Sequence, residues 1–326
     1  MLRVAVLGAS GIASSHIASC RRTPGVDVCA IYSRSLERAE RVARVNGISI
    51  ATDELDGLLS RDDIHAVIVA TEPSRHIDLA LKVMRHKKHL LIEKPIDVDY
   101  SKAVEFARSV GDYDGIVSVV SQYRFDSVLQ EMKYCVSEME DQPLVVIIDL
   151  FKSRSPEYYD HGNGWRQNDS DYFVNQACHW LDVLNWYFGE PVEVHAFSLA
   201  GRSGIKCVDR STAILRYANG SLATIAGGSF QKGYVTSTNF VVRGQDQVVD
   251  YATLARLSLV DRVLRRLIPA RWYQPSQTPS ALDLQIQDFV GAIDSKCQPS
   301  TTVDQAVSAL KLSLSISGRM KYSDAL

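Results

Sequence analysis

The chain has 326 residues, more than one ordinary open-sheet domain needs and enough for two. With 46% hydrophobic and 23% charged residues a globular core is expected, and a formal net charge of -2 without a basic run argues against nucleic acid as a partner. The six cysteines are scattered without a C-x-x-C pair, so no metal site is predicted and a reducing compartment is favoured. Because we find neither a secretory signal nor a long apolar stretch, we expect a cytoplasmic protein that does not engage a membrane.

The first 120 or so residues alternate short apolar runs with segments of helical periodicity. Strands are predicted at 2–7, 26–32, 48–51, 66–70, 89–92 and 116–120, with helices at 12–22, 36–45, 77–86 and 99–110. Continuous apolar strands that alternate with helices are typical of a parallel sheet covered on both faces. We therefore predict an α/β, doubly wound Rossmann domain over residues 1–122.

The rhythm changes after residue 122. A helix is predicted at 126–139, a long strand at 144–150, a loop at 153–171 and a helix at 179–188; turn signals between 192 and 251 indicate antiparallel strands, and helices at 282–293 and 303–317 close the chain. Residues 123–326 are therefore predicted to form an α+β domain, with an open, mostly antiparallel sheet, for substrate and subunit contacts. A basic amphipathic stretch at 260–268 is expected to cover the surface or contact a subunit; the alternative is a membrane-surface role.

The turn after the first strand reads Gly8-Ala9-Ser10-Gly11-Ile12-Ala13 and opens a helix. Gly8 permits a tight turn, and the amides at the helix start favour a pyrophosphate. Ser10 replaces the second glycine of the G-x-G-x-x-G fingerprint, but Gly11 still loosens the loop and the Ser10 hydroxyl can donate to phosphate. We predict that Gly8, Ser10, Gly11 and Ile12 bind a dinucleotide; the alternative is a plain βα turn.

The end of the second strand indicates the preferred cofactor. Selectivity for NAD needs an acidic residue there to accept from the ribose 2′-hydroxyl, whereas the chain reads Ser33-Arg34-Ser35, with Arg38 one turn into the helix. A hydroxyl and a guanidinium can bind a 2′-phosphate. NADP is therefore predicted as the preferred cofactor; the alternative is that Arg34 is solvated and NAD is accepted as well.

Two later segments carry candidate catalytic residues. Lys94 stands at the carboxyl end of the fifth strand, where open parallel sheets bind ligands, and it could hold or deprotonate a substrate hydroxyl. Asn175 and His179 are four residues apart and share one helix face, and Asp182 is expected to orient the imidazole. The alternatives are a solvated lysine and a structural histidine.

These segments together resemble the Gfo/Idh/MocA family of oxidoreductases over nearly the whole length. The resemblance is carried by the turn at 8–13 and by 33–39, 70–76, Glu93-Lys94-Pro95, Tyr123-Arg124-Phe125, the block 175–182 and the last helices from 287 onward. It implies hydride transfer between a nicotinamide and a carbon of a sugar, sugar nucleotide or cyclitol. It also implies that the open sheet forms a subunit interface, so a homodimer or homotetramer is expected.

The resemblance assigns roles by position. It makes Lys94 the catalytic lysine and His179 the second acid–base group, with Asn175 hydrogen-bonding the substrate. It implies a cofactor edge that includes Thr71, Pro73, His76, Glu93 and Lys94, and a substrate pocket that includes Arg124, Trp165, Arg166 and Tyr172. Relatives carry glycines shortly before Asn175, where this chain has bulkier side chains at 169–173. These narrow the pocket, or Tyr172 itself contacts substrate.

Three functions remain open at this point. The favoured one is an NAD(P)-dependent dehydrogenase or reductase acting on CH–OH groups. The others are an NAD-dependent glycosidase using transient redox chemistry and a non-catalytic NAD(P)-binding regulator. Lys94 and His179 favour an enzyme, because a regulator has no chemical need for both. The substrate, the reaction direction and the isomer of the Lys94-Pro95 bond are not predicted.

Overall fold

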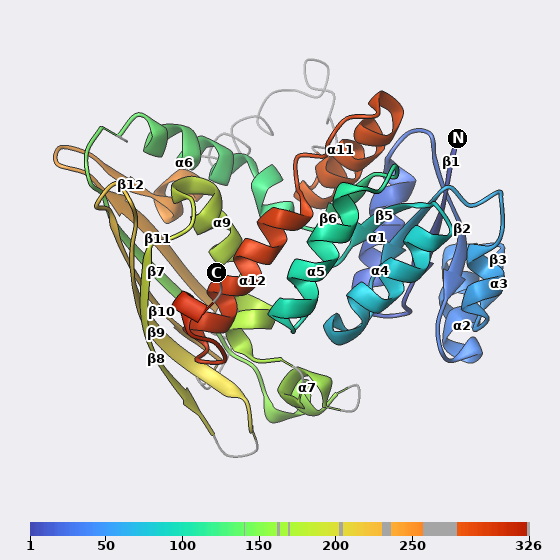
Figure 1. The fold of residues 1–326 in the computed structure, drawn as a ribbon, viewed down its shortest axis with the longest axis horizontal. Helices are drawn as coiled ribbons and strands as arrows, with labels where there is room; N and C mark the ends of the chain where they lie inside the picture. The colour runs from blue at the N-terminus through green and yellow to red at the C-terminus, as the bar shows by residue number, and fades with distance from the viewer. Residues whose placement is uncertain are drawn as a thin grey trace, which may run out of the picture. The chain divides into compact units, whose positions relative to one another are not determined.

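The computed structural model describes residues 1–139, 141–161, 164–168, 170–201, 205–229, 236–256 and 279–324, which form two compact units (Figure 1). The first unit comprises Met1–Gln122 and Ala281–Leu310, and the second comprises Tyr123–Ser280 and Lys311–Leu326. Residues 281–310 therefore belong with the first unit, whereas the sequence placed them in the second domain. The reason is apolar packing, because Ile286 and Phe289 of helix α11 (Ala281–Ser295) are buried in the core of that unit. The basic stretch at 260–268 lies outside the described residues.

The first unit is built on a six-stranded parallel sheet in the order β3-β2-β1-β4-β5-β6. Its strands are β1 (Leu2–Leu7), β2 (Val26–Tyr32), β3 (Ile50–Thr52), β4 (Ala66–Val69), β5 (His89–Ile92) and β6 (Val117–Val119). Its helices are α1 (Gly11–Arg22), α2 (Leu36–Asn46), α3 (Leu55–Leu59), η1 (Pro73–Arg75), α4 (His76–Arg85), α5 (Tyr100–Gly111), α11 and the first part of α12 (Val303–Ile316). The strand order confirms the Rossmann prediction. It brings the carboxyl ends of β1, β4 and β5 to one edge.

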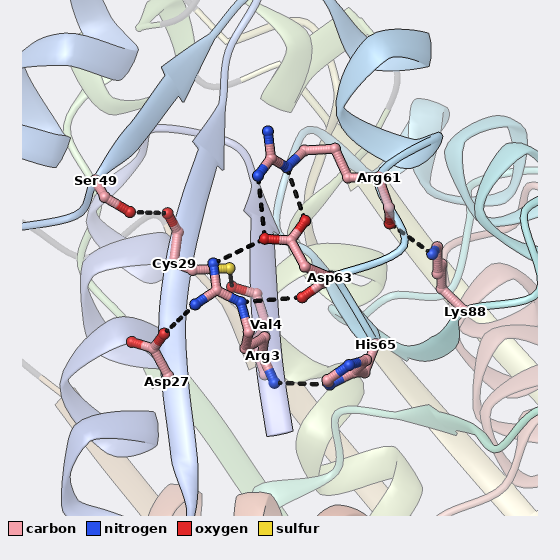
Figure 2. Close-up of polar contacts among 9 residues, drawn as sticks. All are labelled: Arg3, Val4, Asp27, Cys29, Ser49, Arg61, Asp63, His65 and Lys88. Atoms are coloured by element: carbon pink, nitrogen blue, oxygen red, sulfur yellow. Dashed lines mark hydrogen bonds and ion pairs between the residues drawn. The ribbon is translucent and has the colours of Figure 1, made fainter. Parts of the chain in front are cut away.

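The opposite, amino-terminal edge of this sheet is held by charged side chains (Figure 2). Arg3 donates to Asp27 at 3.2 Å and to Asp63 at 3.0 Å, and Asp63 also accepts from Arg61 at 2.9 Å. The hydrogen bond from Arg61 holds the pKa of Asp63 below its usual value. These groups are partly exposed, so each pair adds little stability by itself. We assign this edge a structural role.

The second unit contains a six-stranded sheet in the order β12-β11-β7-β10-β9-β8, antiparallel except for the β7–β10 pair. Its strands are β7 (Val145–Lys152), β8 (Glu193–Ala200), β9 (Val208–Arg216), β10 (Leu222–Gly228), β11 (Thr236–Arg243) and β12 (Val248–Asp250). Its helices are η2 (Gln122–Phe125), α6 (Ser127–Ser137), α7 (Pro156–Asp160), α8 (Trp165–Asn168), the π-helical turn η3 (Phe173–Ala177), α9 (Cys178–Phe188), the end of α12 and η4 (Tyr322–Asp324). One sheet face is buried against side chains of α6, α9 and α12. This confirms the predicted α+β domain.

Candidate active site

The glycine-rich turn lies between β1 and α1. Gly8 has a φ of +123°, and a Cβ atom placed on it would lie 2.3 Å from the carbonyl oxygen of Ala70, so only glycine fits there. A Cβ atom on Gly11 would meet nothing within 4 Å among the described residues, and Gly11 and Ile12 are exposed. The first turn of α1 holds no acidic residue, so its positive end is open to an anion. These residues fit the pyrophosphate of a dinucleotide.

The residues predicted to select the cofactor lie at the end of β2 and the start of α2. Arg34 donates to the Oε1 atom of Glu72 at 2.6 Å, and Arg75 lies 3.8 Å from the same oxygen. The side chain of Arg34 is 64% exposed. The hydroxyl of Ser33 accepts from the backbone N–H of Ser35 at 3.3 Å. The side chain of Arg38 is exposed. The structure therefore places an acceptor, the carboxylate of Glu72, beside the predicted donors.

Lys94 is half-buried at the end of β5, and the Lys94–Pro95 peptide bond is cis. The backbone N–H of Lys94 donates to Oε2 of Glu93 at 2.9 Å, and Oε1 of Glu93 lies 2.8 Å from Nε2 of His16, a buried residue of α1. Burial would raise the pKa of Glu93, but the hydrogen bond and charge of His16, with the charges of Lys94 and His76, hold it below its usual value. Glu93, predicted at the cofactor edge, is therefore a buried support for the backbone of Lys94.

His76 joins two loops at this edge. Its imidazole is fully buried, with Nδ1 2.8 Å from the carbonyl oxygen of Pro95 and Nε2 3.1 Å from that of Thr71. Burial lowers the pKa of His76. The ring therefore lies between the backbone of the loop that follows Lys94 and the backbone of the loop that leads into η1. In the second loop Thr71 is half-buried and Pro73 is buried. His76, predicted at the cofactor edge, therefore connects the two loops through the carbonyl oxygens of Pro95 and Thr71.

The second unit carries Asn175 and His179. Asn175 lies in the π-helical turn η3 and is buried, and His179 is half-buried in α9. Asp171 fixes the start of the turn, because its Oδ1 atom accepts from two successive backbone amides at 2.8 and 3.0 Å. The ring of Tyr123 stacks on His179, with 4.7 Å between centroids and 20° between planes. Burial raises the pKa of Tyr123 to about 12, so a neutral phenol fixes the plane of the imidazole.

Three residues predicted around this block are core residues of the second unit. Asp182, expected to orient His179, accepts from Arg124 Nη2 at 2.6 Å and from its Nε at 2.9 Å, and both side chains are buried. Tyr172 is 3% exposed and donates its hydroxyl to the carbonyl oxygen of Leu150 at 2.6 Å. Arg124 and Tyr172, predicted for the substrate pocket, therefore have their polar groups hydrogen-bonded in the interior of the second unit.

Trp165 and Arg166 lie in the short helix α8, both half-buried, with the Arg166 guanidinium carbon 4.4 Å from the centroid of the Trp165 ring. Over the described ranges, no group of His, Cys, Asp and Glu side chains could hold a metal ion. In the same ranges every helix is too short or too polar to traverse a lipid bilayer.

Residues 2–121 match the family described as "Oxidoreductase family, NAD-binding Rossmann fold", and residues 143–249 match "GFO/IDH/MocA C-terminal domain". The chain belongs to the Gfo/Idh/MocA family of oxidoreductases. The predicted family and its NAD-binding Rossmann domain are thereby confirmed. The match also supports an enzyme rather than a regulator. Relatives of the chain, described next, are named as a dehydrogenase and a reductase.

Two relatives illustrate the range of this family. The chain is 27% identical to "Inositol 2-dehydrogenase 2" of Mycolicibacterium vanbaalenii, over 90% of this chain and 84% of the relative. It is 24% identical to the "1,5-anhydro-D-fructose reductase" of Ensifer adhaerens, over 97% and 95% of the two chains. A solved structure of the WlbA dehydrogenase from Bordetella pertussis, in complex with NADH and UDP-GlcNAcA, superposes with a TM-score of 0.81 at 20% identity, covering 100% and 97% of the two chains. At that identity the likeness shows the fold alone.

Proposed function

We propose that this oxidoreductase transfers a hydride between a nicotinamide cofactor and a secondary alcohol or ketone of a sugar, sugar nucleotide or cyclitol. The observation that carries the proposal is Lys94, held at the ligand-binding edge of the sheet by the buried carboxylate of Glu93. The three substrate classes are those named for the two relatives and for the WlbA complex.

Each proposed residue has a distinct task. A nicotinamide, when bound, supplies or accepts the hydride, and the turn at Gly8, Ser10, Gly11 and Ile12 holds its pyrophosphate. Lys94 and His179 hold or move the proton of the substrate hydroxyl. Asn175 has an amide that does not titrate, so it hydrogen-bonds the substrate without exchanging a proton. Trp165 and Arg166 are proposed to contact the rest of the substrate.

We propose that NADP is preferred over NAD. Ser33, Arg34 and Arg38 offer a hydroxyl and two guanidinium groups for a 2′-phosphate, whereas Glu72 competes for Arg34 at 2.6 Å. In fluorescence titrations, Arg34→Ala should weaken NADPH about tenfold or more and leave NADH nearly unchanged, since hydrogen bonds to charged groups contribute about 1.5–3 kcal/mol. Glu72→Gln should tighten NADPH because it releases Arg34. Equal losses for both cofactors in Arg34→Ala would refute this preference.

We also propose a homodimer or homotetramer formed through the exposed face of the second unit's sheet. Phe197 and Leu199 of β8 and Ile214 of β9 point outward, with exposed fractions of 85%, 63% and 53%. Neighbouring apolar side chains of this size mark interaction surfaces. Light scattering after size exclusion should show an oligomer that Phe197→Lys with Ile214→Lys converts to a monomer; a monomeric wild type would exclude this interface. We propose the cytoplasm as the location, because the six cysteines are thiols rather than disulfides.

A cofactor titration followed by a substrate screen tests the proposed reaction. The protein is mixed with NADP or NAD and with sugars, sugar nucleotides and cyclitols, and the absorbance of the reduced nicotinamide is followed. Net reduction with one of these classes supports the proposal. Cofactor binding without turnover on any class would favour a non-catalytic regulator. Cleavage of a glycoside without net change in the cofactor would favour a glycosidase with transient redox chemistry.

A further inference from the structure

We infer that the second unit contains an anion subsite formed by Arg154 and Arg166 around the ring of Tyr158, and that the substrate carries a carboxylate or a phosphate. This inference rests on the proposed function, because it names the substrate class of the same site. Arg154 follows β7, Tyr158 lies in α7 and Arg166 lies in α8, so three consecutive segments contribute one residue each.

Two guanidinium groups gather on one aromatic ring. The guanidinium carbons of Arg154 and Arg166 each lie 4.6 Å from the centroid of the Tyr158 ring. They are therefore no farther apart than twice that distance, which is comparable with the screening length of about 8 Å at physiological salt. Their mutual repulsion is only partly screened, so an anion beside them is favoured. The aromatic contact orients both groups without using their N–H donors.

This pair of arginines is linked to the turn that carries Asn175. Arg154 Nη2 donates to Oε1 of Gln176 at 3.0 Å, and the amide nitrogen of Gln176 donates to the Tyr158 hydroxyl at 2.5 Å. Gln176 directly follows Asn175 in η3. The positive charge is therefore attached to the same turn as the amide proposed to hold the substrate.

The surrounding groups leave donors of Arg166 available. Its Nε atom is buried and has no hydrogen-bond partner among the described residues, while Nη1 donates weakly to the carbonyl oxygen of His161 at 3.4 Å. Of the acidic residues on α7, Glu157 is exposed and Asp160 accepts from the side chain of Gln167. A buried guanidinium N–H without an acceptor is costly, and its planar fork matches the oxygens of a carboxylate or a phosphate.

Binding of matched probes to the whole protein tests the subsite. With NADP present, titration calorimetry compares glucose, glucuronate and glucose 6-phosphate, which differ in the charged group on one ring. An acidic probe should bind at least about tenfold more tightly than glucose, and Arg154→Gln or Arg166→Gln should weaken its binding by about 10- to 100-fold. Arg154→Gln should change the affinity for glucose by less than about threefold. The better acidic probe tells whether the group is a carboxylate or a phosphate. Arg108→Gln, an exposed arginine of α5, is the matched control.

Equal binding of neutral and acidic probes, or equal loss of both in the variants, would overturn the subsite. If the glutamine variants do not fold, Arg154→Lys and Arg166→Lys keep the charge and should retain part of the preference for the acidic probe. Failure of the proposed function is separable from this result. Turnover of neutral substrates without an acid preference would reject only the subsite, whereas acid binding without nicotinamide turnover would reject only the reaction.

Discussion

Replacing His16 by alanine removes the partner of a buried carboxylate beneath Lys94. Glu93 is 4% exposed, and in the variant its Oε1 atom loses the contact of 2.8 Å while Oε2 keeps the backbone N–H of Lys94 at 2.9 Å. The loss of one hydrogen-bond partner of a buried carboxylate lowers the free energy of unfolding by about 3 kcal/mol. Each kcal/mol shifts the melting temperature of a domain of this size by about 2–4 °C, so we expect a fall of about 6–12 °C.

The pH dependence of this fall distinguishes the loss of the His16–Glu93 contact from the opening of a simple cavity. The contact with His16 lowers the pKa of Glu93 in the folded state, so the stability that it provides is present above the unfolded value of about 4.3 and is lost as the pH falls through the folded value. The difference in melting temperature between wild type and His16→Ala should therefore be largest near pH 7 and should shrink below about pH 4.

Thermal melts between pH 3 and pH 8 measure both effects, and His65→Ala is the matched control. His65 is an exposed histidine at the opposite edge of the same sheet, where it accepts from the backbone N–H of Arg3 (Figure 2). We expect its loss to change stability by less than about 1 kcal/mol. A His16→Ala protein that melts like the wild type, or a difference that is independent of pH, would refute the role of the pair.

Three further predictions concern the glycine-rich turn, the imidazole of His179 and helix α11. Gly8→Ala should lower both the melting temperature and cofactor affinity, because its Cβ atom would overlap a backbone oxygen, whereas Gly11→Ala should leave the melting temperature unchanged; equal melting of the two variants would contradict this. Tyr123→Leu should reduce kcat/KM about 2- to 10-fold through loss of the stack on the imidazole, and Tyr123→Phe should restore it; equal rates in both would remove the stack from the mechanism. Asp283→Asn should destabilise the protein by about 1–2 kcal/mol in thermal melts, because Arg22 of α1 donates to this buried carboxylate at 2.7 Å; an unchanged melting temperature would contradict a role for this contact.

The sequence predicts the sheets well because their signals are local. Continuous apolar strands and alternating strands differ in pattern over a few residues, and those patterns led to both sheets. The packing of α11 on the first unit was not predicted. Ile286 and Phe289 could pack in any apolar core, and the neighbouring sequence does not indicate which core they join. The parallel pairing of β7 with β10 was missed for the same reason.

The residues of the candidate site that sequence reasoning missed are those whose partners lie far along the chain. His16 and Glu93 are 77 positions apart, so spacing could not pair them, although Glu93 stood in a recognised signature. Tyr123 belongs to the recognised Tyr123-Arg124-Phe125 segment, but its stack on His179 is a tertiary contact. Arg154 and Tyr158 fall in the stretch 153–171, which was predicted as a loop because it lacks periodicity, although the structure places Tyr158 in α7.

The rate of nicotinamide reduction by Lys94→Ala measures most directly whether Lys94 performs the chemistry. The assay uses the substrate found in the screen, saturating cofactor and Arg108→Gln as a control. We expect kcat to fall by about 10²- to 10⁴-fold, the usual contribution of a positioned proton-transfer group, with cofactor affinity within about threefold of wild type. Turnover by Lys94→Ala at the wild-type rate would contradict the proposed active site.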